Sequence, residues 1–307
     1  MSTIRIIGVP MDLGTSRRGV DMGPFAVRYA DVRARLVALG HTVEDAGNVA
    51  VPFREDADRG AQHGAQRGAH YLGAITEVCR AVATQTREAL ESGCTPLVLG
   101  GDHSLAAGSI AGAAAHLAAT GKRLGVIWID AHGDVNTPGT SHSGNVHGMP
   151  LAHLLGHGDP ALAGVAGSSP AIRVADLALV GVRDLDDAER EHIAAWKIST
   201  FTMRQVDERG VHGVLEEAIA AVSRDTAGIW ASVDMDVVDP ESAPGVGTAV
   251  SGGMTYREAH HAMEMLADTG RLIGLDLVEV NPVLDVQNRT AELATQLILS
   301  AFGKRIR

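Results

Sequence analysis

The sequence is poor in cysteine and in aromatic residues. Its 307 residues include two cysteines, Cys79 and Cys94, and neither lies in a CxxC pair. So few cysteines exclude a disulfide framework and fit a reducing compartment. Aromatic residues make up 3% of the chain, which is too few for the stacking platforms that bind single-stranded nucleic acids.

Positive charge and long apolar runs are scarce as well. The chain has 26 Lys and Arg residues against 37 Asp and Glu residues, a net charge of -11. A nucleic acid or an anionic membrane surface requires a basic face. The sequence has no apolar run of about eighteen residues, the length that a membrane span needs. Arg5 interrupts the apolar start of the chain, and this start has no signal cleavage site. We therefore expect a cytoplasmic protein with neither a nucleic-acid nor a membrane partner.

Short β-branched runs alternate with longer runs rich in alanine and leucine. The short runs predict strands at residues 3–9, 96–99, 123–130, 176–182, 228–233 and 271–278. The long runs predict helices at residues 24–39, 65–92, 105–120, 186–195, 211–224, 255–267 and 290–302. This alternation predicts an α/β fold, a three-layer sandwich with a mostly parallel sheet covered by helices on both faces. We expect residues 54–70 and 156–170 to be surface segments within one domain, since neither resembles a linker. The chain should therefore form a single domain over residues 1–307.

Polar residues follow directly on four of the predicted strands. The four segments are GGDHS (100–104), DAHGDVN (130–136), SVDMDVVDP (232–240) and LDLVEVNP (275–282). The carboxyl ends of parallel strands meet at one edge of the sheet, and that edge is where ligands bind in such folds. The sequence therefore predicts one acidic site at this edge.

The spacing within these segments indicates a metal centre. Alternate residues of an extended segment share a face, which groups Asp130 with Asp134 and Asp234 with Asp236. The candidate ligands are four carboxylates and two imidazoles: His103, Asp130, His132, Asp134, Asp234 and Asp236. Four negative charges in one pocket need cations, and two divalent ions would neutralise them. Oxygen-rich ligands without thiolates favour Mn(II) or a similar hard ion over structural Zn(II), although the imidazoles also admit Co, Ni or Fe.

These segments, with IGVPMDLGTSRRGVDMGPFAVRYA near the start and GVRDLDDAE in the middle, resemble the ureohydrolase family of arginases, agmatinases and their relatives. The resemblance spans nearly the whole chain and is strongest to the bacterial arginases. It implies an α/β sandwich of about eight parallel strands, in agreement with the hydrophobic pattern. It further implies hydrolysis of the guanidinium of L-arginine to L-ornithine and urea, and assembly into a homo-oligomer, a trimer or a hexamer.

The resemblance implies two Mn(II) ions per subunit. One would be held by His103, Asp130, Asp134 and Asp234. The other would be held by His132, Asp130, Asp234 and Asp236. Asp130 and Asp234 would then bridge the ions, and a hydroxide between them would attack the guanidinium carbon.

The resemblance assigns catalytic roles to three residues. Asp134 would take the hydroxide proton and pass it to the leaving amine. His147 would exchange protons with the solvent. Glu279, delivered by the run before it, would orient the guanidinium through a charge-assisted hydrogen bond.

Six further residues match substrate contacts of the family. Asn136, Ser143 and Asn145 would bind the α-carboxylate of an amino-acid substrate. Asp186, assisted by Glu189, would bind the α-ammonium, and Thr248 would line the metal pocket. Agmatine has no carboxylate, so Asn136 favours arginine as the substrate.

Three alternatives stay open. The protein could act on agmatine or on another guanidino substrate, as guanidinobutyrase and formimidoylglutamase do. It could be a metal-binding paralogue without turnover. It could also be a Zn-dependent deacetylase of related architecture, which would bind a single metal ion.

Overall fold

The structure is a computed structural model that describes residues 1–59 and 68–305. Its strands are β1 (Thr3–Val9), β2 (Thr42–Asn48), β3 (Thr95–Gly100), β4 (Leu124–Ile129), β5 (Leu177–Val182), β6 (Ser199–Thr202), β7 (Gly228–Asp234) and β8 (Leu272–Val278). These eight strands form one sheet in the order β2-β1-β3-β8-β7-β4-β5-β6, and every neighbouring pair is parallel. The expected parallel sheet of about eight strands is confirmed.

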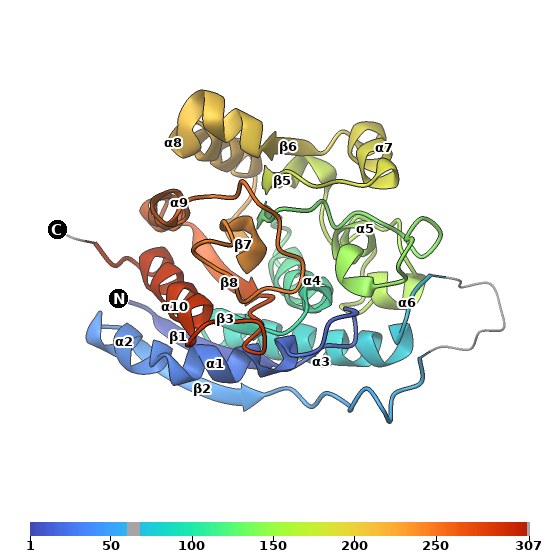
Figure 1. Cartoon of the computed structure of the whole chain (residues 1–307), viewed down its shortest axis with the longest axis horizontal. Helices are drawn as coiled ribbons and strands as arrows, with labels where there is room; N and C mark the ends of the chain where they lie inside the picture. Colours follow the sequence, from blue (N-terminus) through green and yellow to red (C-terminus); the bar gives the residue numbers. More distant parts are fainter. Residues whose placement is uncertain (60–67, 306–307) are drawn as a thin grey trace.

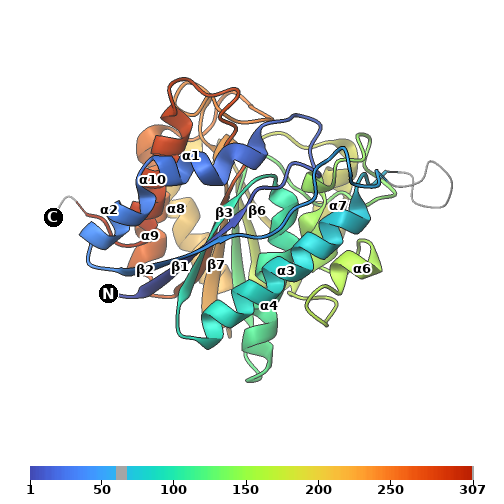
Figure 2. The same cartoon turned by 90° about the horizontal axis from the view of Figure 1, so that it is seen from below.

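Helices cover both faces of this sheet (Figures 1 and 2). They are α1 (Gly23–Tyr29), α2 (Val32–Ala38), α3 (Leu72–Glu91), α4 (Ala106–Ala118), α5 (Pro150–Leu154), α6 (Pro160–Ala163), α7 (Asp187–Trp196), α8 (Met203–Val222), α9 (Tyr256–Asp268) and α10 (Arg289–Ala301). One hydrophobic core joins the sheet to α1, α2, α8, α9 and α10. The other joins it to α3, α4, α5 and α6. The three-layer arrangement is therefore confirmed.

Alternation along the strands divides their side chains between the two cores. In β4, Ile127 and Ile129 belong to the core under α8 and α9, whereas Val126 and Trp128 belong to the core under α3 and α4. Successive side chains of a strand point to opposite faces. A strand covered on both sides is therefore apolar throughout, as the uninterrupted run in β4 shows.

The structure corrects two of the predicted helices. Residues 24–39 form two helices, because Asp31 between them has a left-handed backbone with φ of 61°. The helix predicted at 211–224 begins directly after Gly210, where φ is 73°, and an additional helical stretch that starts at Met203 precedes it within α8. The helix predicted at 65–92 begins at Leu72, and residues 65–67 lie outside the described residues, as do residues 60–64 of the predicted surface segment at 54–70.

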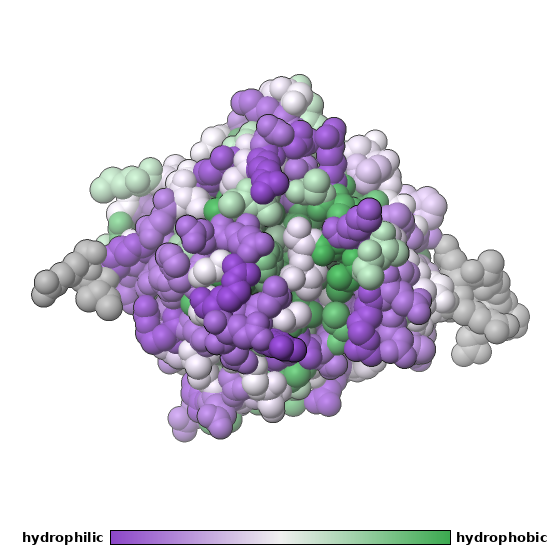
Figure 3. All heavy atoms as spheres, turned by 90° about the horizontal axis from the view of Figure 1, so that it is seen from above, coloured by the Kyte–Doolittle hydropathy of each residue, from purple (hydrophilic) through white to green (hydrophobic). Residues whose placement is uncertain are grey.

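The face of the molecule in Figure 3 is mainly hydrophilic, and its most hydrophobic residues gather in a central strip. Within residues 1–59 and 68–305, no helix combines the length and the apolar character needed to cross a bilayer.

Helices α3 and α4 lie side by side on the sheet (Figure 2), and glycines let them approach closely. A Cβ atom added at Gly108 of α4 would collide with the backbone carbonyl oxygen of Cys79 in α3, and one at Gly112 would collide with that of Ala83. We expect Gly108→Ala to lower the free energy of unfolding by about 1–3 kcal/mol, because the helices must move apart. Urea denaturation measures this change.

Gly73 is the matched control for this prediction. It lies within α3, but a Cβ added there meets no atom of the described residues within 4 Å beyond its own stretch of helix. Gly73→Ala should leave stability unchanged or raise it, because alanine favours the helix. Equal stability of Gly108→Ala and wild type would show that the two helices separate without cost.

Candidate metal centre and active site

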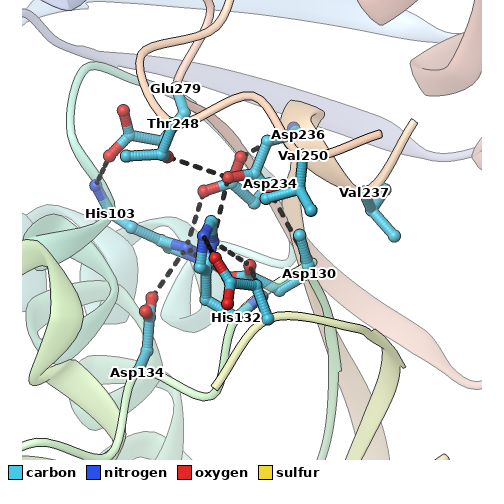
Figure 4. A network of polar contacts seen from close by, with 12 residues as sticks. His103, Asp130, His132, Asp134, Asp234, Asp236, Val237, Thr248, Val250 and Glu279 are labelled. Carbon is cyan, nitrogen blue, oxygen red and sulfur yellow. Dashed lines mark hydrogen bonds and ion pairs between the residues drawn. The ribbon is translucent and has the colours of Figure 1, made fainter. Parts of the chain in front are cut away.

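The four segments predicted to carry the chemistry follow four adjacent strands in the middle of the sheet. These strands lie in the order β3-β8-β7-β4. His103 follows β3, Asp130 follows β4, Asp234 ends β7, and Glu279 follows β8. Figure 4 shows their side chains pointing toward one another at this edge of the sheet. Parallel topology therefore brings together residues far apart in the sequence.

His103 faces a group of three carboxylates. Its Nδ1 atom lies 3.2 Å from Oδ2 of Asp130, 3.3 Å from Oδ2 of Asp134 and 3.3 Å from Oδ2 of Asp234. The imidazole is fully buried. Its Nδ1 atom forms no hydrogen bond within the part of the chain that the structure describes. A buried ring nitrogen turned toward carboxylates in this way is the arrangement that a metal cation satisfies.

His132 forms a second group beside the first. Its Nδ1 atom lies 3.1 Å from Oδ2 of Asp236 and 3.4 Å from Oδ1 of Asp130. The ligand atoms of His103, Asp130 and Asp134 lie within 4.8 Å of one another, as do those of Asp130, His132 and Asp236. Asp130 belongs to both groups, so the six side chains fit a pair of adjacent cations with Asp130 between them.

Hydrogen bonds hold the carboxylates in place. Oδ2 of Asp130 accepts from the indole Nε1 of Trp128 at 3.0 Å, and its Oδ1 accepts from the backbone N–H of His132 at 2.6 Å. Oδ2 of Asp236 accepts from the hydroxyl of Thr248 at 3.0 Å. Thr248 therefore acts on the candidate metal centre indirectly, because its hydroxyl supports Asp236. Such outer contacts orient metal ligands.

The centre carries an excess of negative charge. Burial, together with the charge of Asp130, raises the pKa of Asp134 to about 6. Burial and the charges of Asp236 and Asp130 raise the pKa of Asp234 well above its usual range. Carboxylates buried this close resist ionisation. Divalent cations would offset their repulsion, and the oxygen and imidazole donors are ligands that such ions accept.

Glu279 and His147 form a pair next to the centre. Oε1 of Glu279 accepts from the backbone N–H of His103 at 3.0 Å and lies 3.0 Å from Nδ1 of His147. Burial opposes the charged form of His147, but Glu279 outweighs it and raises the pKa of the imidazole to about 9. Oε2 of Glu279 is buried, and no described residue donates to it. Glu279 thus has one oxygen held by the protein and one available to a cationic group.

Two residues of the site have left-handed backbones. The φ angle is 53° at Asp134 and 63° at Glu279. Non-glycine residues in this region are strained by about 1–3 kcal/mol and persist where their surroundings hold them. Both side chains are thereby fixed toward the centre.

The predicted substrate residues fall into two groups. In the first, Asp186 caps α7: its Oδ1 accepts from the backbone N–H of Glu189 at 2.8 Å. Its Oδ2 accepts from Nδ2 of Asn136 at 2.7 Å. Burial and the charge of Asp134 raise the pKa of Glu189 to about 7. Asn136, Asp186 and Glu189 therefore form one connected acidic cluster near the candidate metal ligands.

The second group lies in the segment after β4. The hydroxyl of Ser143 accepts from the backbone N–H of Asn145 at 3.2 Å. Ser16 donates its hydroxyl to Oδ1 of Asn145 at 2.9 Å. Sequence reasoning missed Ser16, because nothing in the local pattern of the N-terminal loop indicates that it reaches this segment.

The comparisons with known proteins agree with this arrangement. The sequence profile of the Arginase family matches residues 2–303. The arginase of Bacillus caldovelox is 49% identical over 306 residues, covering 100% of both chains, and that of Brevibacillus brevis is 47% identical over 301 residues, covering 98% of both. The solved native arginase of Bacillus caldovelox superposes with a TM-score of 0.94 at 48% identity over 100% of both chains. The chain therefore belongs to the Arginase family.

Proposed function

We propose that this protein hydrolyses the guanidinium group of L-arginine to L-ornithine and urea at a centre of two Mn(II) ions. The observation that carries the proposal is the pair of acid–imidazole groups sharing Asp130, next to a buried Glu279 with one free oxygen. Similarity to arginases over the full chain supports the same substrate.

One ion would be held by His103, Asp130, Asp134 and Asp234. The other would be held by His132, Asp130, Asp234 and Asp236. When bound, two such ions lower the pKa of water and stabilise the negative charge that develops during hydrolysis.

Glu279 would bind and orient the guanidinium. Its Oε2 atom has no donor among the described residues, whereas a guanidinium offers donors in a planar fork that matches a carboxylate. The bonds that Oε1 makes to His103 and His147 prevent the side chain from rotating. The substrate carbon would therefore be held over the metal pocket.

His147 and Asp134 would move protons. Asp134 lies inside the centre, 3.3 Å from the ring of His103, where it can accept the proton released by the attacking water and pass it to the departing amine. His147 has a pKa of about 9, so its imidazolium is available near neutral pH. Its side chain is 16% exposed, which lets it exchange protons between the site and the solvent.

The amino-acid end of the substrate would be bound by the two outer groups. Asn136, Ser143 and Asn145 would receive the α-carboxylate. Asp186, with Glu189, would receive the α-ammonium. In Asp186, one oxygen caps α7 and the other already accepts from an amide, so the carboxylate is oriented before the substrate arrives.

The parallel assay of two substrates tests the proposal. Mn(II)-loaded protein is given L-arginine or agmatine at equal concentration, and urea is measured. We expect rapid release from arginine and little from agmatine, which lacks the α-carboxylate. Release from agmatine alone would show that Asn136 and Asp186 do not contact an amino acid, and no release from either would contradict guanidinium hydrolysis.

Asp186→Asn should raise the KM for L-arginine by roughly 10- to 100-fold, the loss expected for one charge-assisted hydrogen bond. Asparagine keeps the helix cap, so the folded state should persist with unchanged metal content. Asp187→Asn is the control, because the side chain of Asp187 is 91% exposed on the same helix. Steady-state kinetics with arginine measure this change. A KM equal to that of the control would show that Asp186 does not bind the substrate.

We further propose a cytoplasmic homo-oligomer, a trimer or a hexamer, in which each chain is one domain. The free thiols of Cys79 and Cys94 support a reducing compartment. Light scattering coupled to size-exclusion chromatography measures the number of chains, and a monomer would contradict this part of the proposal.

A further inference from the structure

A buried carboxylate outside the six ligands lies behind the metal centre. Asp276 is in the middle of β8 and is fully buried. Its Oδ2 atom accepts three hydrogen bonds, from Ser109 at 2.8 Å, from the indole of Trp230 at 2.9 Å and from Ser232 at 3.1 Å. Burial raises the pKa of Asp276 to about 6, and the three donors that converge on one oxygen oppose this by favouring the ionised form. None of the catalytic steps proposed above uses this residue.

Strand register connects Asp276 to the centre. Ser232 of β7 is paired with Asp276 of β8 on one side and with Trp128 of β4 on the other. The three side chains therefore form a row across the sheet, on the face covered by α4. The ring of His103 stacks on Trp128 with centroids 3.9 Å apart, and its Nε2 atom lies 2.9 Å from the hydroxyl oxygen of Ser232. Ser232 thus bridges Asp276 and His103.

The direction of these hydrogen bonds fixes the proton on His103. A serine hydroxyl has a single hydrogen, and Ser232 donates it to Asp276. The oxygen of Ser232 must therefore accept from Nε2 of His103, which requires a hydrogen on that nitrogen. In the neutral ring the lone pair is then on Nδ1, the atom that faces the carboxylates at 3.2–3.3 Å.

We propose that Asp276 is a positioning residue of the metal centre: through Ser232 it holds His103 in the tautomer whose Nδ1 lone pair faces the metal. The inference rests on the proposed function only in requiring that the centre binds divalent metal. Histidine ligands whose second nitrogen is hydrogen-bonded in this way are better oriented and more basic. The effect acts on the metal group that contains His103, because His132 has no contact with Ser232 or Asp276 among the described hydrogen bonds.

Calorimetric titration of metal-free, full-length protein with Mn(II) tests this role. Ser232→Ala and Asp276→Ala should weaken one of the two binding steps about tenfold or more and leave the other step unchanged. Electron paramagnetic resonance at two equivalents of Mn(II) should then show the signal of isolated ions in place of the coupled pair. Asp276→Ala removes the acceptor of the Ser232 hydroxyl and leaves Ser232 in place, so it gives the test even if Ser232→Ala does not fold.

Ser109→Ala is the matched control. It removes a hydrogen bond to the same oxygen of Asp276, but Ser109 does not lie between Asp276 and His103. Its titration should equal that of wild type, and Ser232→Thr, which restores a hydroxyl, should recover the affinity. Equal weakening by Ser109→Ala and Ser232→Ala, or loss of both binding steps together, would overturn the proposal in favour of a merely structural role. This titration contains no substrate. If the wild-type protein released no urea in the separate substrate assay, that result would contradict the proposed function but not this inference.

Discussion

Asp130→Ala should lose both metal ions and reduce urea release from L-arginine by more than about 10³-fold, the scale expected when metal-assisted hydrolysis is lost. Asp130 contributes to both acid–imidazole groups, so its removal takes an oxygen from each ion. It also leaves the indole of Trp128 without its acceptor. Metal content after dialysis and the rate of urea release are the two measurements.

Asp268→Ala is the control for Asp130→Ala. The side chain of Asp268 is 69% exposed at the end of α9, far along the chain from any ligand. This variant should keep its metal and its activity. Full activity of Asp130→Ala after its metal has been lost would contradict a metal-dependent reaction.

Glu279→Gln should lower kcat/KM for L-arginine by about 2–5 kcal/mol of transition-state stabilisation, which is roughly 30- to several thousand-fold. Glutamine has nearly the same shape and can still accept the backbone hydrogen bond of His103, but it brings no charge to the guanidinium. The metal content should stay at the wild-type level, since Glu279 is not a proposed ligand. Kinetics and metal analysis together separate this effect from that of Asp130→Ala.

The matched variant for Glu279 is Glu216→Gln, an exposed glutamate of α8. It changes the net charge by the same amount and should leave kcat/KM unchanged. A Glu279→Gln protein as active as Glu216→Gln would show that the free oxygen of Glu279 does not bind the guanidinium.

The interior of the sheet could be predicted from the sequence, but its two edges could not. Strand β2 has the sequence TVEDAGN, and within it only Val43 is buried. Strand β6 has four residues, of which only Phe201 is buried. Both edge strands are largely polar because one side of each is open, so hydrophobic runs do not reveal them. The resemblance to ureohydrolases supplied the count of about eight.

The break within residues 24–39 could not be predicted for a different reason. The positive φ at Asp31 separates α1 from α2, yet both helices bury their apolar residues in the same core. Periodicity reports which residues face the core, but it does not report a change of helix direction between them.

The clustering of the acid and imidazole side chains is the part of the site that sequence pattern predicts well. Asp130 directly follows one apolar strand, and Asp234 ends another. Parallel topology brings these strand ends together. The sequence pattern does not indicate a role for Asp276, because its partners come from α4 and β7. Its contact with Ser232 depends on β7 and β8 being neighbours in register. Strand order, which the sequence does not encode locally, decides such contacts.

The most direct test of the account is a titration of metal-free protein with Mn(II), in which urea release from L-arginine is followed against metal bound per chain. The account predicts that activity rises with metal and reaches its maximum at two ions per chain, because both groups that share Asp130 must be filled. Full activity with one ion per chain, or with no metal at all, would contradict it.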